Sequence, residues 1–199
     1  MQQESLAKLF SMTTVTIRSK TIEDFFVNAY RFATVTGLRP GELLDLKWRD
    51  ISGSAITING SFNAKGEHTR GKNRNAKRSF VLNRYAKEIL QAQRKMLMSK
   101  AVRSDYVFCD EDGTQLNQRK FYRRWIRFRD HNGLDKASPY ELRHTFISIA
   151  QDLPDSVLKP IAGHSRTFDT RGIYAHELKG HEEHAAQLVS DALQKALEM

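Results

Sequence analysis

The chain has 199 residues, 40% of them hydrophobic, which excludes a wholly disordered polypeptide and allows one large domain. Its net charge of +9 and isoelectric point of about 9.7 point to a polyanionic partner, most often nucleic acid, with a merely basic enzyme as the alternative. A single cysteine, Cys109, excludes an internal disulfide framework, and no apolar run has the length of a membrane span.

Two helices are predicted near the start of the chain, the first over residues 21–36. Thr21 and Asp24 form a candidate capping box for this helix, and Gly37 suits its end. Pro40 suits the first turn of a short second helix.

The middle of the chain predicts strands on either side of a basic hairpin. The runs AITI at 55–58 and SFVL at 79–82 have strand character, and the Gly- and Asn-containing stretch 63–78 is typical of hairpin turns. A helix over 84–99 and a short strand at 106–109 are expected to follow.

The C-terminal half is predicted to be helical. Asn117 can cap a helix that runs to about Asp130, and the sequence SPYE from Ser138 is a strong start for a helix to about Gln151. Further helices are expected over residues 155–162, 167–174 and, as an amphipathic segment, 179–198. Because strands and helices do not alternate, we expect a mainly α fold with a small three-stranded antiparallel β-sheet.

Two segments concentrate positive charge. The stretch RGKNRNAKR, residues 70–78, has five Lys or Arg in nine positions and fits either a solvated hairpin or a contact with phosphates. In the predicted helix from Asn117, an aromatic face suited to the core is flanked by a second face of arginines four residues apart. The aromatic face holds Phe121, Trp125 and Phe128, and the basic face holds Arg119, Arg123 and Arg127.

Two further arginines lie at positions suited to function. Arg39 falls between a helix-ending Gly and a helix-starting Pro in TGLRPGELLDL, where Glu42 either fixes its guanidinium or makes a plain salt bridge. Arg143 and Tyr140 lie in the first turns of the predicted helix SPYELRHTF, away from its buried stripe. The unpaired N–H groups there favour an anion, so we expect Arg143 to project from a phosphate site.

Four ordered segments together resemble the catalytic domain of tyrosine recombinases, most closely the integrases of phages and conjugative transposons. The segments hold Arg39 in TGLRPGELLDL, Lys72 on the basic hairpin, Arg143 in YELRH, and His164 and Tyr174 in GHSRTFDTRGIYAH. They span most of the chain, from residue 36 to residue 177.

The resemblance implies a site-specific DNA recombinase that cuts and rejoins strands through a 3′-phosphotyrosyl intermediate on Tyr174, with no ATP, metal or other cofactor. It implies a phosphate clamp of Arg39 and Arg143, a proton donor at Lys72 and a phosphate contact from His164. The family usually has a histidine where this chain has Tyr140. A phenol can make a hydrogen bond there, but with an ordinary pKa of about 10 it cannot cycle protons near neutral pH.

The resemblance also sets expectations for organisation and partners. Residues 1–178 would form the catalytic domain, and the helix in 179–199 would pack on its own domain or dock on a neighbouring protomer. The core-binding and arm-binding domains that usually precede such a domain are expected to be absent. Expected partners are double-stranded DNA attachment sites, further copies in a homotetramer on DNA, and DNA-bending accessory proteins, in a bacterial cytoplasm and with no membrane.

Three other interpretations stay open. The first is an integrase-derived DNA-binding regulator that is weakly active or inactive, for which Tyr140 is the best argument. The others are a type IB topoisomerase and a basic RNA-binding protein. The histidines at 176, 181 and 184 lack the spacing of a zinc site, so we interpret them as surface residues.

Overall fold

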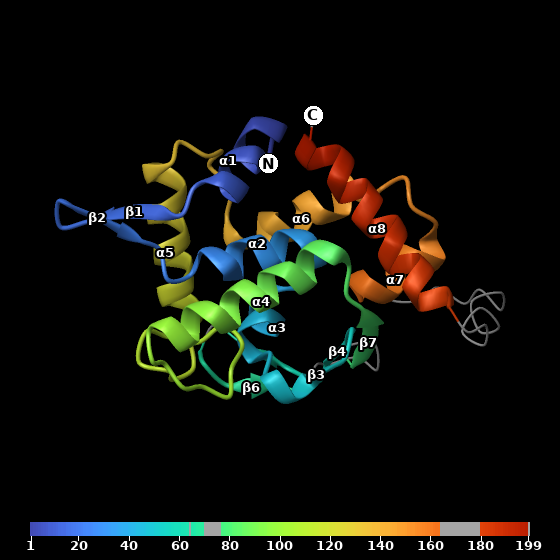
Figure 1. Cartoon of the computed structure of the whole chain (residues 1–199), viewed down its shortest axis with the longest axis horizontal. Coiled ribbons are helices and arrows are strands. Elements are labelled where there is room, and N and C mark those ends of the chain that lie inside the picture. Colours follow the sequence, from blue (N-terminus) through green and yellow to red (C-terminus); the bar gives the residue numbers. More distant parts are fainter. Residues whose placement is uncertain (64, 70–76, 164–179, 199) are drawn as a thin grey trace.

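The computed structural model describes residues 1–63, 65–69, 77–163 and 180–198, and within these residues most of the regular structure is helical (Figure 1). The helices are α1 (Gln3–Ser11), α2 (Val27–Thr36), α3 (Pro40–Asp45), α4 (Arg84–Ser99), α5 (Gln118–His131), α6 (Pro139–Ile149), α7 (Asp155–Ala162) and α8 (His181–Glu198). The strands are β1 (Thr14–Ile17), β2 (Lys20–Glu23), β3 (Ile51–Ser52), β4 (Ala55–Ile58), β5 (Ser61–Phe62), β6 (His68–Thr69) and β7 (Arg78–Val81).

The predicted three-stranded antiparallel sheet is confirmed, with the order β3-β4-β7. Strands β4 and β7 pair over their full length, from Ala55 opposite Val81 to Ile58 opposite Arg78. Two separate hairpins, β1–β2 and β5–β6, complete the β-structure of the described residues. The fold is therefore mainly α with small antiparallel sheets, as expected.

Two predicted elements differ from the structure: one helix is present but shorter, and one strand is reduced to isolated bridges. The helix expected over 21–36 begins only at Val27, because Thr21 pairs with Thr16 in the β1–β2 hairpin, and Asp24 accepts a hydrogen bond from the backbone N–H of Phe26 instead of capping from a box with Thr21. The strand expected at 106–109 forms only isolated bridges, Lys47 with Tyr106 and Cys109 with Gln115. The helix predicted at 167–174 lies outside the described residues.

The centre of the core is aromatic. Tyr30 of α2 is surrounded by the three aromatic side chains of α5, with ring centroids 5.0–5.4 Å apart, and the indole N–H of Trp125 donates to the carbonyl of Ala137 at 2.7 Å. Those three side chains are the predicted core face of α5: Phe121, Trp125 and Phe128. Helix α2 also packs against α4 and α6, and all of its residues except Arg31 are buried.

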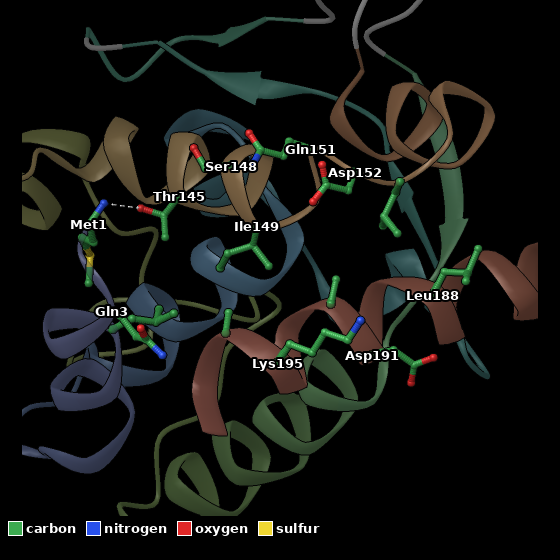
Figure 2. Close-up of a pocket in the computed structure, with 14 residues that line it drawn as sticks. Met1, Gln3, Thr145, Ser148, Ile149, Gln151, Asp152, Leu188, Asp191 and Lys195 are labelled. Carbon is green, nitrogen blue, oxygen red and sulfur yellow. Dashed lines mark hydrogen bonds between the residues drawn. The ribbon is translucent and has the colours of Figure 1, made fainter. Parts of the chain in front are cut away.

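The C-terminal helix α8 packs on its own chain. It contacts α1, α4, α6 and β7, with Val189 and Leu193 fully buried, and the hydroxyl of Ser190 accepts a hydrogen bond from the backbone N–H of Arg84. A groove of about 660 Å³ runs between α8, α1 and the end of α6 (Figure 2). Within it the amino group of Met1 donates to the hydroxyl of Thr145 at 2.9 Å.

Candidate active site

Three arginines converge on the C-terminal end of α7. Each donates to one of three successive backbone carbonyls there, and they come from β7, from α6 and from the residue before α3. The pairs are Arg78 with Ile161, Arg143 with Ala162 and Arg39 with Gly163, at N–O distances of 3.0, 2.6 and 3.4 Å. We call Arg39, Arg78, Arg143 and Glu42, the carboxylate that joins Arg39 and Arg78, the arginine cluster.

The end of α7 attracts positive charge for two reasons. Its last carbonyls have no partner within the helix, and the helix dipole places partial negative charge there. The helix stops at Gly163, whose φ of 65° is left-handed and whose N–H donates to the carbonyl of Lys159. The guanidinium groups therefore satisfy carbonyls that the helix cannot.

Glu42 holds two of the arginines together. Its Oε1 accepts from Arg39 Nη1 and Arg78 Nη1 at 2.8 and 3.0 Å, and its Oε2 accepts from Arg78 Nη2 and the Arg39 backbone N–H at 2.9 and 3.0 Å. Burial alone would raise the pKa of Glu42, but the hydrogen bonds and charges of Arg78 and Arg39 outweigh it, and the pKa lies below its ordinary value. The predicted pairing of Glu42 with the Arg39 guanidinium is present, and Arg78 shares the same carboxylate.

Arg39 is the accessible member of the cluster. It precedes Pro40 at the start of α3, and 37% of its side chain is exposed. The turn before it needs Gly37, because φ there is +64° and a Cβ would lie 2.3 Å from the ring of Phe146. The local sequence thus fixes where Arg39 leaves the core and leaves more than a third of its side chain exposed.

Arg143 corrects an expectation from the sequence. It was expected to project from the exposed side of its helix, but only 2% of it is exposed. Its Nη1 donates to the carbonyl of Gly37 at 2.6 Å, while its Nη2 holds Ala162. The buried surface of α6 is therefore wider than its apolar stripe. Burial and then the charge of Arg39 hold the pKa of Arg143 below its ordinary value.

Tyr140 lies one turn before Arg143 but faces solvent. It is 45% exposed, and its ring packs edge-on against His144 with centroids 5.2 Å apart. The start of this helix is as predicted: the carboxylate of Glu141 accepts a hydrogen bond from the backbone N–H of Ser138. The structure therefore brings Arg39 and Arg143 together and leaves Tyr140 beside them, and a role for its hydroxyl stays a prediction.

Three predicted site residues lie outside the described residues: Lys72, His164 and Tyr174. In the chain, His164 directly follows Gly163, and Lys72 precedes Arg78 by six positions.

Arg78 is the residue that the sequence interpretation missed. It was included only as the last residue of the basic stretch 70–78, yet both of its terminal nitrogens donate to Glu42. The signal was the two-residue period of β7, which puts Arg78 on the same side of the strand as the buried Phe80. A charged residue on the buried side of a strand needs a partner, and Glu42 is that partner.

Other surfaces are separate from the cluster. The basic face of α5 is exposed as predicted, at Arg119, Arg123 and Arg127. The groove of Figure 2 is not lined by Arg39, Tyr140 or Arg143. In the part of the chain that the structure describes, no group of residues could hold a metal ion, and no helix has the length and apolar character to cross a membrane.

Comparison with solved structures finds the same fold. The Tn1549 transposon integrase in complex with transposon right end DNA superposes with a TM-score of 0.61 at 19% identity, over 99% of this chain and 64% of that one. The lambda integrase catalytic core gives 0.58 at 17% identity, over 83% and 90%. The XerH site-specific recombinase bound to difH substrate gives 0.54 at 19%, over 82% and 45%.

The chain thus spans less than two thirds of the Tn1549 integrase chain it resembles. No curated protein sequence matches it. The sequence profile of the phage integrase family, in contrast, matches residues 1–181. The chain therefore belongs to the phage integrase family of tyrosine recombinases, and its fold is that of their catalytic domain.

Proposed function

We propose that this chain is the catalytic domain of a site-specific DNA recombinase that cuts and rejoins DNA through a covalent bond to Tyr174. The observation that carries the proposal is the meeting of Arg39 and Arg143 at the end of α7, from positions 104 residues apart in sequence. Two guanidinium groups on adjacent carbonyls offer planar, permanently charged donors to one phosphate.

The charge of the cluster supports an anionic ligand. Among the residues that the structure describes, the three guanidinium groups of the cluster form ion pairs with one carboxylate, Glu42, so positive charge is in excess. Burial lowers the pKa of Arg143, and the positive charge of Arg39 lowers it further. A phosphate bound at Arg39 would relieve the repulsion, and the additional negative charge of the transition state would relieve it further.

The sequence positions of His164, Lys72 and Tyr174 support the roles proposed for them. His164 is one peptide bond from Gly163, and Lys72 is six residues from Arg78, within about 20 Å even for extended chain. Tyr174 is six residues before Gly180, the start of the next described segment. Each proposed residue thus belongs to a segment that is attached to the cluster or to α8.

The chemistry needs no external energy source. The Tyr174 hydroxyl attacks the phosphorus and loses its proton to solvent, the bond to the 5′-oxygen breaks, and Lys72 gives that oxygen a proton. Arg39 and Arg143 stabilise the charge on the two non-bridging oxygens, and His164 contacts the same phosphate. Attack by another 5′-hydroxyl on the phosphotyrosine reverses these steps and joins the new strand.

The expected partners follow from the relatives. The Tn1549 integrase is in complex with transposon right end DNA, a lambda integrase dimer is bound to a COC′ core site, and XerH is bound to difH substrate. Double-stranded DNA attachment sites are the substrate we propose here, in a bacterial cytoplasm. We further propose assembly of a homotetramer on DNA, with DNA-bending accessory proteins. Docking of α8 on a neighbour would require it to leave its own core, where Val189 and Leu193 are buried. Mass photometry of the DNA complex measures the number of protomers.

A non-catalytic DNA-binding regulator is the second candidate. It is favoured by Tyr140 and by Arg143, whose two terminal nitrogens already hold carbonyl groups. Such a protein would bind DNA and form no covalent product. The experiment below separates the two functions.

The test uses duplexes tiled across the DNA that borders the protein's own coding sequence, each with a nick that prevents religation. Wild-type protein should form an adduct that survives denaturant, and Tyr174→Phe should form none. Arg143→Ala should lose cleavage by about a hundredfold or more while the DNA Kd changes by less than about fivefold. Equal losses of cleavage and affinity would show that Arg143 only holds DNA, and an adduct that persists in Tyr174→Phe would remove Tyr174 from the mechanism.

A further inference from the structure

We propose that Arg78 is a positioning residue: it orients Arg39 through Glu42 and anchors the end of α7 from which the His164 segment leaves. This inference rests on the proposed function, because its consequence is the alignment of the phosphate clamp. Arg78 was not among the residues predicted to be catalytic.

The first argument is the geometry of the shared carboxylate. Arg78 binds Glu42 through both terminal nitrogens, at 3.0 and 2.9 Å, and both side chains are more than nine-tenths buried. This fork leaves the Glu42 carboxylate only one orientation, in which Oε1 also meets Arg39 Nη1 at 2.8 Å. The direction of the Arg39 guanidinium therefore depends on Arg78.

The second argument separates positioning from direct contact with DNA. Arg78 uses Nε on Ile161 and its terminal nitrogens on Glu42, and 8% of its side chain is exposed. Arg39, in contrast, is more than a third exposed and its contact to Gly163 is long, at 3.4 Å. A phosphate can thus reach Arg39 while Arg78 stays bound within the protein.

The third argument is the fit between Arg78 and the helix end. A Cβ on Gly163 would lie 2.9 Å from Arg78 Cζ, so the backbone of Gly163 and the guanidinium are in direct contact. Arg78 begins β7, whose preceding segment holds Lys72, and Gly163 directly precedes His164. One side chain thus joins the starting points of two segments that carry proposed catalytic residues.

The test compares Arg78→Lys and Arg78→Met with a matched surface control, Arg84→Met, whose side chain is about half exposed. Lysine keeps the charge but loses the fork that orients Glu42. Single-turnover cleavage is measured on a duplex identified by wild-type adduct formation, together with the DNA Kd and the thermal unfolding midpoint. We expect Arg78→Lys to stay folded, to bind DNA within about threefold of wild type, and to cleave about a hundredfold more slowly. Arg84→Met should cleave at the wild-type rate.

A second substrate distinguishes positioning from a general loss of structure. In a methylphosphonate duplex, one charged non-bridging oxygen at the cleaved phosphate is replaced by a methyl group, so less charge needs Arg39. The defect of Arg78→Lys should shrink at least tenfold on this substrate, and Arg39→Lys should show the same pattern. A wild-type rate for Arg78→Lys, or an equal defect on both substrates, would overturn the inference.

An assay without DNA keeps the two proposals distinguishable. Absence of any wild-type adduct would count against the proposed function. The orientation of Arg39 is then read from hydrogen exchange of its guanidinium N–H groups by NMR, which Glu42 slows. Exchange should accelerate at least tenfold in Arg78→Lys, and unchanged exchange would refute the role of Arg78 whatever the protein does to DNA.

Discussion

Glu42 and Asp24 are both buried carboxylates near arginines, yet their pKa values shift in opposite directions. Glu42 accepts four hydrogen bonds in the arginine cluster, and its pKa lies below the ordinary value despite burial. Within the part of the chain that the structure describes, the Asp24 side chain accepts one hydrogen bond, from the N–H of Phe26, and its Oδ2 has no hydrogen-bond partner. Burial raises the pKa of Asp24 to about 6. Among the cations, Arg124 lowers the pKa of Asp24 most. Its Nη2 donates a hydrogen bond to Glu111, however.

The comparison shows that nearby charge is not enough to stabilise a buried carboxylate; donors must point at its oxygens. It also assigns opposite pH dependences. Glu42 contributes stability that is present above its unfolded pKa and is lost as the pH falls through its lowered folded pKa. Asp24 has its full contribution below the ordinary pKa of 3.8 and loses it as the pH rises through about 6.

Removing the Glu42 carboxylate should have the largest effect on the free energy of unfolding. Glu42→Ala leaves Arg78 buried with no counter-charge, so we expect the free energy of unfolding at pH 7 to fall by about 3–5 kcal/mol in urea titrations. The control Glu88→Ala removes an exposed carboxylate whose distance to Arg84 is 4.0 Å, and should change stability by less than about 0.5 kcal/mol. A loss below about 1 kcal/mol for Glu42→Ala would mean that the cluster is not a structural unit.

Removing the charge of Asp24 should change how the free energy of unfolding depends on pH. Asp24→Asn keeps an acceptor for Phe26 but cannot ionise, so the variant escapes the loss that wild type suffers between about pH 4 and pH 7. From the shift of the Asp24 pKa from 3.8 to about 6, its stability relative to wild type should rise by about 3 kcal/mol across that range. Parallel profiles for the two proteins would contradict the account of Asp24.

Substitutions at two glycines separate the contact between Arg78 and the end of α7 from the cost of a left-handed backbone. Gly163 and Gly133 both follow helices at φ near +65°, but a Cβ meets Arg78 only at Gly163 and has open space at Gly133. Gly133→Ala should cost about 1 kcal/mol for the left-handed backbone alone, and Gly163→Ala about 2 kcal/mol. Equal costs in thermal unfolding would show that the contact with Arg78 contributes nothing.

An exposed carboxylate provides the smallest expected effect. Hydrogen bonds to Ser138 at the start of α6 lower the pKa of Glu141. Glu141→Gln keeps a hydrogen-bond acceptor and loses only the negative charge near the start of the helix dipole. The free energy of unfolding should therefore change by about 0.5 kcal/mol or less. If Glu141→Gln lowered the free energy of unfolding as much as Glu42→Ala, an exposed and a buried carboxylate would contribute equally to stability.

Local patterns predicted the parts of the fold that depend on neighbours in sequence. The i, i+4, i+7 spacing of Phe121, Trp125 and Phe128 identified the core face of α5, and Gly37 marked the end of α2. The β1–β2 hairpin escaped because its turn residues, Arg18 and Ser19, adopt positive φ without a glycine signal.

The site was predictable only in part. Periodicity treats a charged residue as exposed, but Arg143 is buried because its partners are carbonyls of Gly37 and Ala162, which are 106 and 19 residues away. The same long-range pairing hid Arg78, whose carboxylate is 36 residues away. The roles of Lys72, His164 and Tyr174 depend on the resemblance and stay predictions.

The most direct measurement is the chemical identity of the protein–DNA bond. Wild-type protein is incubated with the nicked duplexes, the denatured adduct is digested with protease and nuclease, and the modified peptide is sequenced by mass spectrometry. The account predicts a nucleotide attached through its 3′-phosphate to the hydroxyl of Tyr174. A bond at any other side chain, or DNA cut with no protein attached, would contradict it.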